Sequence, residues 1–272
     1  MMDMESSECK TYTLTELEQK DAISWITLNN PQKKNALSAT MISELIELLK
    51  EIADDENQRV VVIQGADGVF CSGADLDWMR QGVDQNLQQN MEDAQLFYRL
   101  YSTLFYFPKP VMVWVEKFAF GGATGIIACA DYVLSDKNSV FGFPEVKLGL
   151  VPGTIAPFIV KKISFNHAKS YMLSGETFSA KKAKKIGFVN EIVKAENKEE
   201  RIKVLAEQFK KNSPEAITST KHLLNRIVDN GELNEDMANL CCHTISSARI
   251  SNEGQEGVNA FFEKRKPYWI KD

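Results

Sequence analysis

The chain has 272 residues, of which 44% are hydrophobic and 25% are charged, and its formal net charge is -5 at pH 7. This length and apolar content suffice for one large domain, or for a buried core with a smaller appendage. The acidic balance argues against nucleic-acid binding, because neutralising phosphates requires clustered Lys and Arg. No apolar run approaches the length of a membrane span, so no membrane partner is expected.

The cysteines and the first residues bear on the compartment. The five cysteines form no C-x-x-C pair and their number is odd, which favours reduced thiols over a disulfide framework. The segment Met1–Glu8 lacks the basic start and apolar stretch of a signal peptide. We therefore expect a cytoplasmic protein. The three histidines lack the spacing of metal ligands, so no metal site is predicted.

The first third of the chain predicts strands around one helix. Alternating patterns over Tyr12–Leu17 and Ile23–Leu28 indicate a hairpin. Ser38 is a suitable N-cap for an amphipathic helix, and an apolar strand over Val60–Gln64 follows that helix. The apolar face of the helix consists of Met41, Ile42, Leu45, Leu48, Leu49 and Ile52.

The remaining pattern indicates an α/β protein that ends in helices. A helix over Met91–Phe107 and a strand over Val111–Val115 repeat the strand and helix order, which predicts crossovers on a curved parallel sheet. After Thr154 only Phe188–Val193 still has an extended pattern. We place a boundary near Ala195, between a core of residues 1–195 and a helical region of residues 196–272. The predicted helices are Ile155–Ile163, Ala168–Leu173, Glu199–Lys211, Pro214–Asp229, Glu235–Ile250 and Glu253–Glu263.

The segment Lys117–Asp131 predicts a site for developing negative charge. The strand Val111–Val115 leads into Gly121-Gly122 and then into the apolar run Ile126–Cys129, which indicates strand, tight turn and helix. The first N–H groups of a helix lack internal partners, and glycine lets a ligand approach the backbone. A tight turn without function is the alternative for the glycines alone.

Two further segments strengthen this interpretation. Val69–Met79 follows an apolar strand in the same way and supplies a second donor. Glu145 stands among apolar residues in Phe141–Leu150, where burial would disfavour its charged form and prepare it for proton transfer. The alternative for Glu145 is a surface loop position paired with Lys147.

The chain resembles the crotonase superfamily, the enoyl-CoA hydratase/isomerase family. Besides the two segments above, Leu28–Ser38 and Ser251–Pro267 are similar to family signatures, in the family's order, and the likeness extends from about Tyr12 to Trp269. It implies an α/β fold built as a spiral of strand-strand-helix turns. The C-terminal helices are implied to pack between subunits of a homotrimer or homohexamer.

The resemblance also implies a reaction on an acyl-CoA thioester. The N–H groups of Ala74 and Gly122 would hold the thioester oxygen, and Glu145 would be the catalytic glutamate. Hydratases of the family usually carry a second glutamate where this chain has Gly125. A single carboxylate must then activate water and deliver the proton, or the reaction is an isomerisation between the second and fourth carbons.

The substrate expected from the resemblance is a branched enoyl-CoA. The motifs are most similar to bacterial methylglutaconyl-CoA hydratases of leucine degradation, which also have glycine at the position of Gly125. We expect Gly125 to leave space beside the acyl chain. For the distal carboxylate of such a substrate the candidate partners, each with a solvated surface role as the alternative, are Arg80, Arg99 and Lys147.

Coenzyme A is part of this substrate, and no separate cofactor is expected. Aromatic residues that would line the acyl pocket, or belong to the core, are Trp78, Phe97 and Tyr98, together with Met79. An exposed turn without function is the alternative for the two lysines of the first signature. The substrate-binding residues implied by the resemblance are Lys33, Lys34, Ala36, Ser72, Asp75, Leu76, Gly121, Gly125, Phe261 and Lys264.

Three functions stay open at this stage. The chain is a hydratase that adds water, an isomerase that moves the double bond, or a non-catalytic acyl-CoA-binding or RNA-binding relative on the same fold. No aromatic-rich basic face supports RNA binding.

Overall fold

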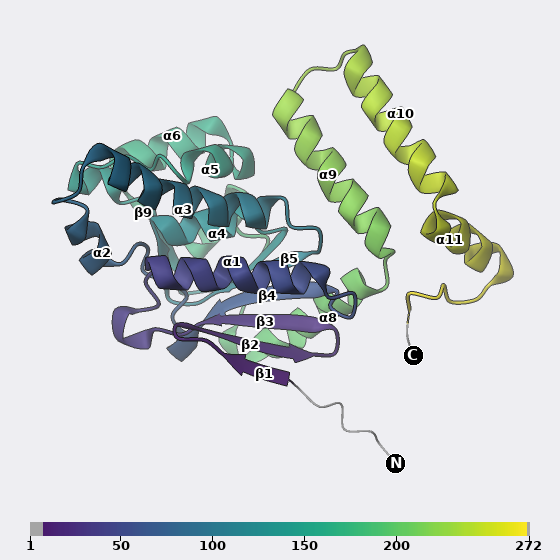
Figure 1. The fold of residues 1–272 in the computed structure, drawn as a ribbon, viewed down its shortest axis with the longest axis horizontal. Helices are drawn as coiled ribbons and strands as arrows, with labels where there is room; N and C mark the ends of the chain where they lie inside the picture. Colours follow the sequence, from purple (N-terminus) through teal and green to yellow (C-terminus); the bar gives the residue numbers. More distant parts are fainter. Residues whose placement is uncertain (1–7, 271–272) are drawn as a thin grey trace.

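The computed structural model describes residues 8–270, which form two sheets covered by helices (Figure 1). The larger sheet has seven strands in the order β1-β2-β3-β4-β5-β7-β10. Neighbours from β1 to β3 are antiparallel, and those from β3 to β10 are parallel. The strands are β1 (Glu8–Thr11), β2 (Thr15–Lys20), β3 (Ile23–Leu28), β4 (Val60–Gly65), β5 (Val111–Val115), β7 (Tyr132–Asp136) and β10 (Glu191–Val193).

The smaller sheet lies close to the candidate site. It pairs β6 (Phe118–Phe120) with β8 (Val140–Gly142) in parallel, and β8 with β9 (Thr177–Ser179) in antiparallel fashion. Because β6 ends at the residue before Gly121 and β8 ends three residues before Glu145, this sheet holds two of the predicted site segments side by side.

Eleven α-helices lie within the described residues. They are α1 (Ala39–Asp54), α2 (Leu76–Gln81), α3 (Leu87–Phe105), α4 (Gly122–Cys129), α5 (Ala156–Lys162), α6 (Phe165–Ser174), α7 (Ala180–Lys185), α8 (Lys198–Lys210), α9 (Pro214–Asn230), α10 (Glu235–Ile250) and α11 (Asn252–Glu263). None of them is long and apolar enough to cross a membrane. Short 3-10 helices are η1 (Pro31–Lys33), η2 (Ala66–Gly68), η3 (Glu145–Leu148) and η4 (Ala195–Asn197).

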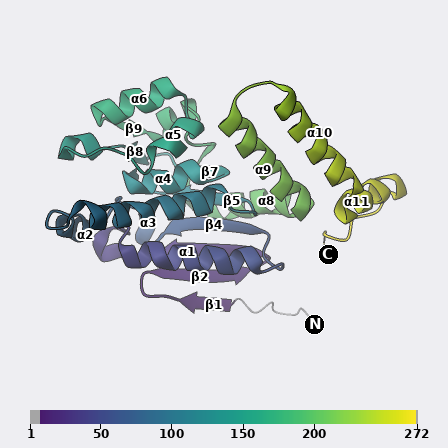
Figure 2. The same ribbon diagram turned by 45° about the horizontal axis from the view of Figure 1, so that its top comes forward.

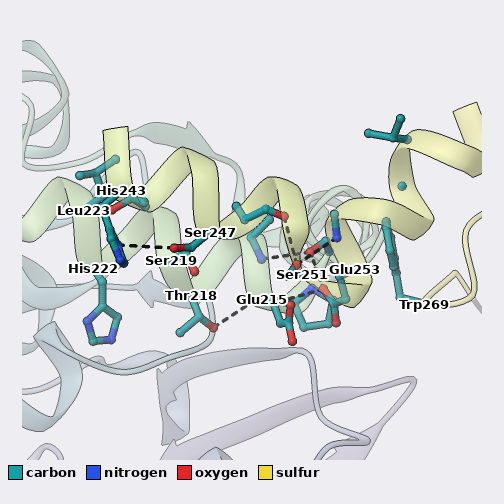
Figure 3. Close-up of a pocket in the computed structure, with 18 of the residues that line it drawn as sticks. Glu215, Thr218, Ser219, His222, Leu223, His243, Ser247, Ser251, Glu253 and Trp269 are labelled. Carbon is teal, nitrogen blue, oxygen red and sulfur yellow. Dashed lines mark hydrogen bonds between the residues drawn. The ribbon is translucent and has the colours of Figure 1, made fainter. Parts of the chain in front are cut away.

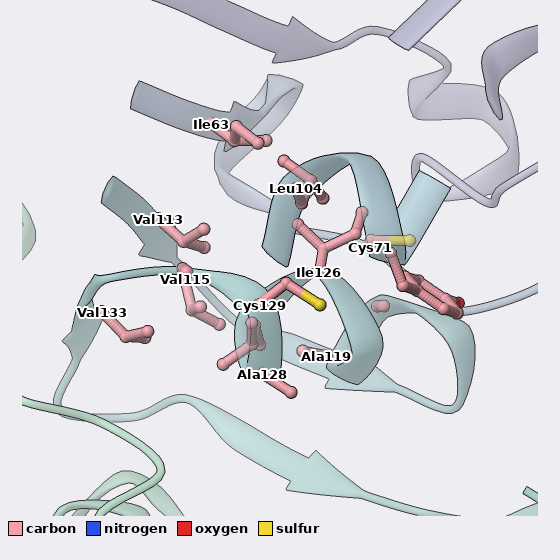
Figure 4. Close-up of a cluster of buried hydrophobic side chains, with 14 of the residues drawn as sticks. Ile63, Cys71, Leu104, Val113, Val115, Ala119, Ile126, Ala128, Cys129 and Val133 are labelled. Carbon is pink, nitrogen blue, oxygen red and sulfur yellow. The ribbon is translucent and has the colours of Figure 1, made fainter. Parts of the chain in front are cut away.

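Helices cover both faces of the larger sheet. The alternation along β4 places Val61 and Ile63 in the main core with α1, α3 and α4, and Val60 and Val62 in a second cluster with α8. Figure 4 shows side chains of β5, α3 and α4 gathered in the main core. At about 25 cal/mol per Å² of apolar surface removed from water, this burial is the main stabilising term and fixes α4 on the sheet.

Helices α9 to α11 extend from this body to one side (Figures 1 and 2). On α9, Lys221 pairs with Asp131 at 2.5 Å, and the side-chain amide of Asn225 donates to the carbonyl of Phe105 at 3.1 Å. These contacts attach α9 to the core, whereas α10 and α11 pack on α9 and on each other. The boundary near Ala195 stays a prediction.

The expected α/β class with C-terminal helices is confirmed. The hairpin, the Ser38 cap and the apolar face of α1 are as predicted, since the Oγ of Ser38 accepts from the N–H of Met41 and the six expected side chains are buried. The strand expected over Phe188–Val193 is shorter, because Phe188 and Val189 turn into the core and only Glu191–Val193 pairs with β7.

Candidate active site

The first expected donor, the N–H of Gly122, begins α4. Gly121 precedes it with a φ of +49°, a conformation that side chains disfavour, and its own N–H donates to the carbonyl of Gly142 on β8 at 3.1 Å. Within residues 8–270 the N–H of Gly122 donates no hydrogen bond. A helix start that leaves this donor unpaired favours an anionic or strongly polar ligand oxygen.

The second expected donor, the N–H of Ala74, is held by two neighbouring hydrogen bonds. The N–H of Leu37 donates to the carbonyl of Gly73 at 2.8 Å, and the N–H of Asp75 donates to the carbonyl of Leu37 at 2.9 Å. The N–H of Ala74 between them has no acceptor in the part of the chain that the structure describes. The backbone is therefore fixed while the donor stays available.

Gly73 brings the two donor segments together. A Cβ atom at Gly73 would lie 2.7 Å from the carbonyl oxygen of Phe120 and 3.8 Å from the nitrogen of Gly122. Only glycine permits this approach, and its φ of +102° also excludes most side chains. Since unpaired backbone N–H groups are rare in proteins, two of them side by side indicate an oxyanion site.

Glu145 lies beside the same turn. A Cβ atom at Gly121 would be 3.2 Å from its Oε1 atom, and its buried Oε2 atom has no hydrogen-bond partner among the described residues. The net pKa of Glu145 is raised. Burial raises it more than the hydrogen bond from its own backbone N–H lowers it. A raised pKa makes this carboxyl a better proton donor and acceptor at the pH where enzymes work than an ordinary surface carboxylate is. The predicted alternative, an ion pair with Lys147, is absent from the described part of the chain.

The raised pKa of Glu145 predicts a pH-dependent stability. A proton binds more tightly to this carboxyl in the folded state, so its contribution to stability is full at low pH and is lost as pH rises through the folded-state pKa. We expect the melting temperature of Glu145→Gln, which cannot ionise, to rise relative to that of the wild type over the pH range above 4.5, the ordinary pKa of this carboxyl. Thermal scans across this range test it, with exposed Glu200→Gln as the control. A constant difference between Glu145→Gln and wild type would contradict it.

The residues expected to bind coenzyme A from the first half of the chain lie together. Ser72 joins the two signatures, because its N–H donates to the carbonyl of Lys34 at 3.1 Å and its hydroxyl donates to that of Lys33 at 3.2 Å. Ala36 is buried and Leu76 is 74% exposed. These residues thus flank the Ala74 donor.

The two lysines differ in their partners. Lys33 contacts Asp75 at 2.8 Å and Asp77 at 2.6 Å. The net pKa of Asp75 is lowered. Burial acts to raise it, but hydrogen bonds from Lys33 and from two backbone N–H groups of α2 outweigh the effect of burial. Lys34 has no carboxylate partner within residues 8–270, and its ammonium lies 6.0 Å from the ring centroid of Phe118. Lys34 is therefore the freer cation for a phosphate.

The expectation that Gly125 leaves space beside an acyl chain is wrong. A Cβ atom at Gly125 would lie 2.5 Å from both Cε1 and Cζ of Tyr101, and 2.9 Å from Cγ2 of Ile155. The ring of Tyr101 fills this volume. Of the aromatic residues expected at the pocket, Phe97 approaches the Cβ position of Gly122 to 3.1 Å and stacks on Trp78 with 5.2 Å between ring centroids.

Phe261 and Lys264 lie away from this cluster in the same chain. They stand at the end of α11, at the opposite side of the molecule from α2 in both views (Figures 1 and 2). A separate cavity of about 910 Å³ lies between α9, α10 and α11 and includes His222 and His243 (Figure 3). Arg80 and Arg99 are exposed side chains of α2 and α3.

Sequence reasoning assigned no role to Asn35 and Tyr101. The Asn35 amide donates to the carbonyls of Ala66 and Val69 at 3.1 and 2.7 Å, and its oxygen accepts from the N–H of Asn30, so it supports the loop that pairs with the Ala74 segment. Tyr101 stands four residues after Phe97 on α3. This spacing places both side chains on the same face of the helix and could have identified Tyr101 from the sequence.

Two unpaired backbone N–H groups beside a half-buried carboxyl group are typical of enzymes that stabilise an oxyanion and move a proton. The profile of the family described as "Enoyl-CoA hydratase/isomerase" matches residues 18–272. The chain therefore belongs to the enoyl-CoA hydratase/isomerase family of the crotonase superfamily. It is an enzyme of the enoyl-CoA hydratase type that acts on acyl-CoA.

Solved structures and curated relatives agree along nearly the whole chain. An enoyl-CoA hydratase from Shewanella pealeana is 34% identical, with a TM-score of 0.91 over 94% of this chain and 96% of that one. Pseudomonas aeruginosa AtuE is 32% identical, with a TM-score of 0.90 over 95% and 100%. The 2,3-dehydroadipyl-CoA hydratase of Escherichia coli is 29% identical over 244 residues, which are 89% of this chain and 92% of that protein.

Proposed function

We propose that this protein adds water across the 2,3 double bond of a branched enoyl-CoA. The observation that carries the proposal is the pair of unpartnered N–H groups of Ala74 and Gly122 next to the half-buried carboxyl of Glu145, whose Oε2 atom is buried without a hydrogen-bond partner. The thioester oxygen would accept from both N–H groups. The third carbon of the conjugated ester would then become electrophilic, because charge develops where the donors already point.

Glu145 would serve as both base and acid. As the oxygen of a water molecule bonds to the third carbon, the carboxylate takes one proton from that water, and the double-bond electrons move toward the thioester oxygen. The Glu145 carboxylic acid then returns the proton to the second carbon, which restores the thioester carbonyl. The net change is addition of H and OH, and the enzyme ends in its starting state.

For the acyl group we propose a 3-methylglutaconyl-like chain and a place in leucine degradation. The similarity of the glycine-rich motifs to methylglutaconyl-CoA hydratases supports this. The name of the 29% identical Escherichia coli protein, 2,3-dehydroadipyl-CoA hydratase, also describes a substrate with a distal carboxylate. The candidate partners of that carboxylate are the exposed cations Arg80, Arg99 and Lys147.

An isomerase remains the second candidate. A specific observation favours it: at Gly125, where hydratases of the family usually carry the second glutamate, the ring of Tyr101 fills the volume of a side chain. Shuttling one proton between the second and fourth carbons needs a single group. A non-catalytic acyl-CoA-binding role would not account for the buried Oε2 atom of Glu145, which has no hydrogen-bond partner among the described residues.

We also propose that the protein works as a homotrimer or homohexamer in the cytoplasm. Exposed apolar side chains on α10 and α11, including Ile250, Phe261 and Phe262, favour contact with another copy. Since Phe261 and Lys264 lie far from Ala74 in their own chain, they would bind coenzyme A held by a neighbouring copy. A monomer in sedimentation equilibrium would contradict this. The free thiols of Cys71 and Cys129 fit a reducing compartment.

The reaction is tested by mass spectrometry in heavy water. The protein is incubated separately with 3-methylglutaconyl-CoA, crotonyl-CoA and a 3-enoyl-CoA. We expect the first ester to gain one heavy water faster than crotonyl-CoA does. Deuterium uptake without added water would instead establish the isomerase, and no change together with no binding of any ester would refute the enzyme assignment.

A further inference from the structure

Tyr101 occupies an unusual position on α3. Its side chain is fully buried, and it packs between Phe97 and Phe158 with ring centroid distances of 6.2 and 5.8 Å. The ring therefore has neighbours from α3 and α5 and is held in one orientation. Its hydroxyl donates to the carbonyl of Gly122 at 2.8 Å.

This contact reaches the residue that supplies the first donor. The ring lies against Gly125, and the hydroxyl lies 3.1 Å from the Cβ position of Gly122, so one side chain spans the two glycines that stand three residues apart on α4. Burial raises the pKa of Tyr101 well above its ordinary value, with smaller contributions from Cys129, Cys71 and Glu145 in the same direction. The hydroxyl thus stays a donor at neutral pH.

We propose that Tyr101 is a positioning residue for the thioester site. Its hydrogen bond to the Gly122 carbonyl, together with its ring packed on Gly125, sets the orientation of the first residue of α4. The Gly122 N–H is then aimed at the thioester oxygen when substrate arrives. Glycine at 125 is needed because the ring of Tyr101 takes the place of a side chain there.

The inference rests on the proposed function, because it concerns polarisation of a bound thioester. Helix α4 begins with Gly122 after Gly121 at the N-cap, so neither residue has a side chain of its own that could pack and orient the Gly122 N–H. Tyr101 provides such packing from outside the helix. A shift of the donor by a fraction of an ångström weakens the contact most in the transition state, where the oxygen carries most charge.

The test uses the full-length Tyr101→Phe variant. The ring is kept, and the Gly122 carbonyl can still accept an intrahelical hydrogen bond as the first residue of α4. The variant should therefore fold. We expect kcat to fall about fivefold to tenfold while KM stays within about twofold. The matched control is Tyr132→Phe, which removes a tyrosine hydrogen bond to Glu191 of 3.1 Å on the β7–β10 side of the sheet. The control should keep wild-type kcat.

A spectroscopic measurement separates positioning from a general structural effect. 4-(Dimethylamino)cinnamoyl-CoA, a conjugated thioester, absorbs at longer wavelength when its carbonyl is polarised. We expect a clear red shift on binding to wild type and to Tyr132→Phe, and a smaller one with Tyr101→Phe. A second variant, Gly125→Ala, should also reduce the red shift, because its methyl group would displace the Tyr101 ring.

The outcomes are distinct. A reduced kcat with a reduced red shift supports the proposal. An unchanged red shift in Tyr101→Phe overturns it, whatever happens to kcat, and leaves the enzyme assignment in place if wild type turns over. A wild type that shows neither a red shift nor turnover of any enoyl ester overturns the proposed function and this inference together.

Discussion

Replacement of Glu145 by glutamine is expected to reduce kcat by about 10² to 10⁴ while an enoyl-CoA still binds. The amide is nearly isosteric with the carboxyl group but can neither take a proton from water nor deliver one to carbon. The two backbone donors remain, so thioester binding should change little. Turnover of the preferred ester in the heavy-water assay, with calorimetric titration of its saturated analogue, measures both quantities.

The control for this loss is Glu176→Gln, an exposed glutamate that should keep full activity. A melting temperature at or above that of wild type would show that Glu145→Gln is folded. Retention of more than about a hundredth of wild-type kcat by Glu145→Gln would remove Glu145 from the acid–base role, since the smallest expected effect is about 10². Weakened binding with unchanged kcat would assign it to substrate binding instead.

Alanine at Gly73 is expected to reduce kcat by about 10² to 10³, the effect of losing one oxyanion donor. The new methyl group would lie 2.7 Å from the carbonyl oxygen of Phe120, which is closer than real contacts allow, and φ of +102° adds strain. Relief of the clash moves Ala74 away from Gly122. Steady-state kinetics and the red shift of the conjugated thioester should decline together.

Gly231→Ala is the matched control for Gly73→Ala. Gly231 also has a positive φ, +62°, but a Cβ atom there meets nothing within 4 Å. Both variants suffer backbone strain, but only Gly73→Ala also clashes with a neighbouring carbonyl oxygen. Gly231→Ala should therefore lose some stability and keep wild-type kcat. A folded Gly73→Ala protein with normal kcat would exclude the N–H of Ala74 from the oxyanion site.

Much of the fold could be predicted from local patterns. The strand Val111–Val115 and the helix Glu235–Ile250 have the predicted bounds, because continuous apolar runs and capping residues are signals within a few residues of each other. β1 was not predicted, since Glu8–Thr11 has little apolar content and is a strand only through pairing with β2. The Phe188–Val193 prediction was too long, because an apolar run does not distinguish a strand from a buried turn.

The sequence by itself indicated two glycine-rich segments from residue type and short spacing, and its resemblance to the crotonase superfamily indicated Glu145 as the candidate catalytic group and Ala74 and Gly122 as the candidate donors. Only the tertiary structure decided that Tyr101 fills the volume at Gly125, that Asp75 and Asp77 hold Lys33, and that Phe261 lies far from the site within one chain. These are contacts between segments distant in sequence. They depend on how helices pack on the sheet, and a local sequence pattern does not predict which distant residues come into contact.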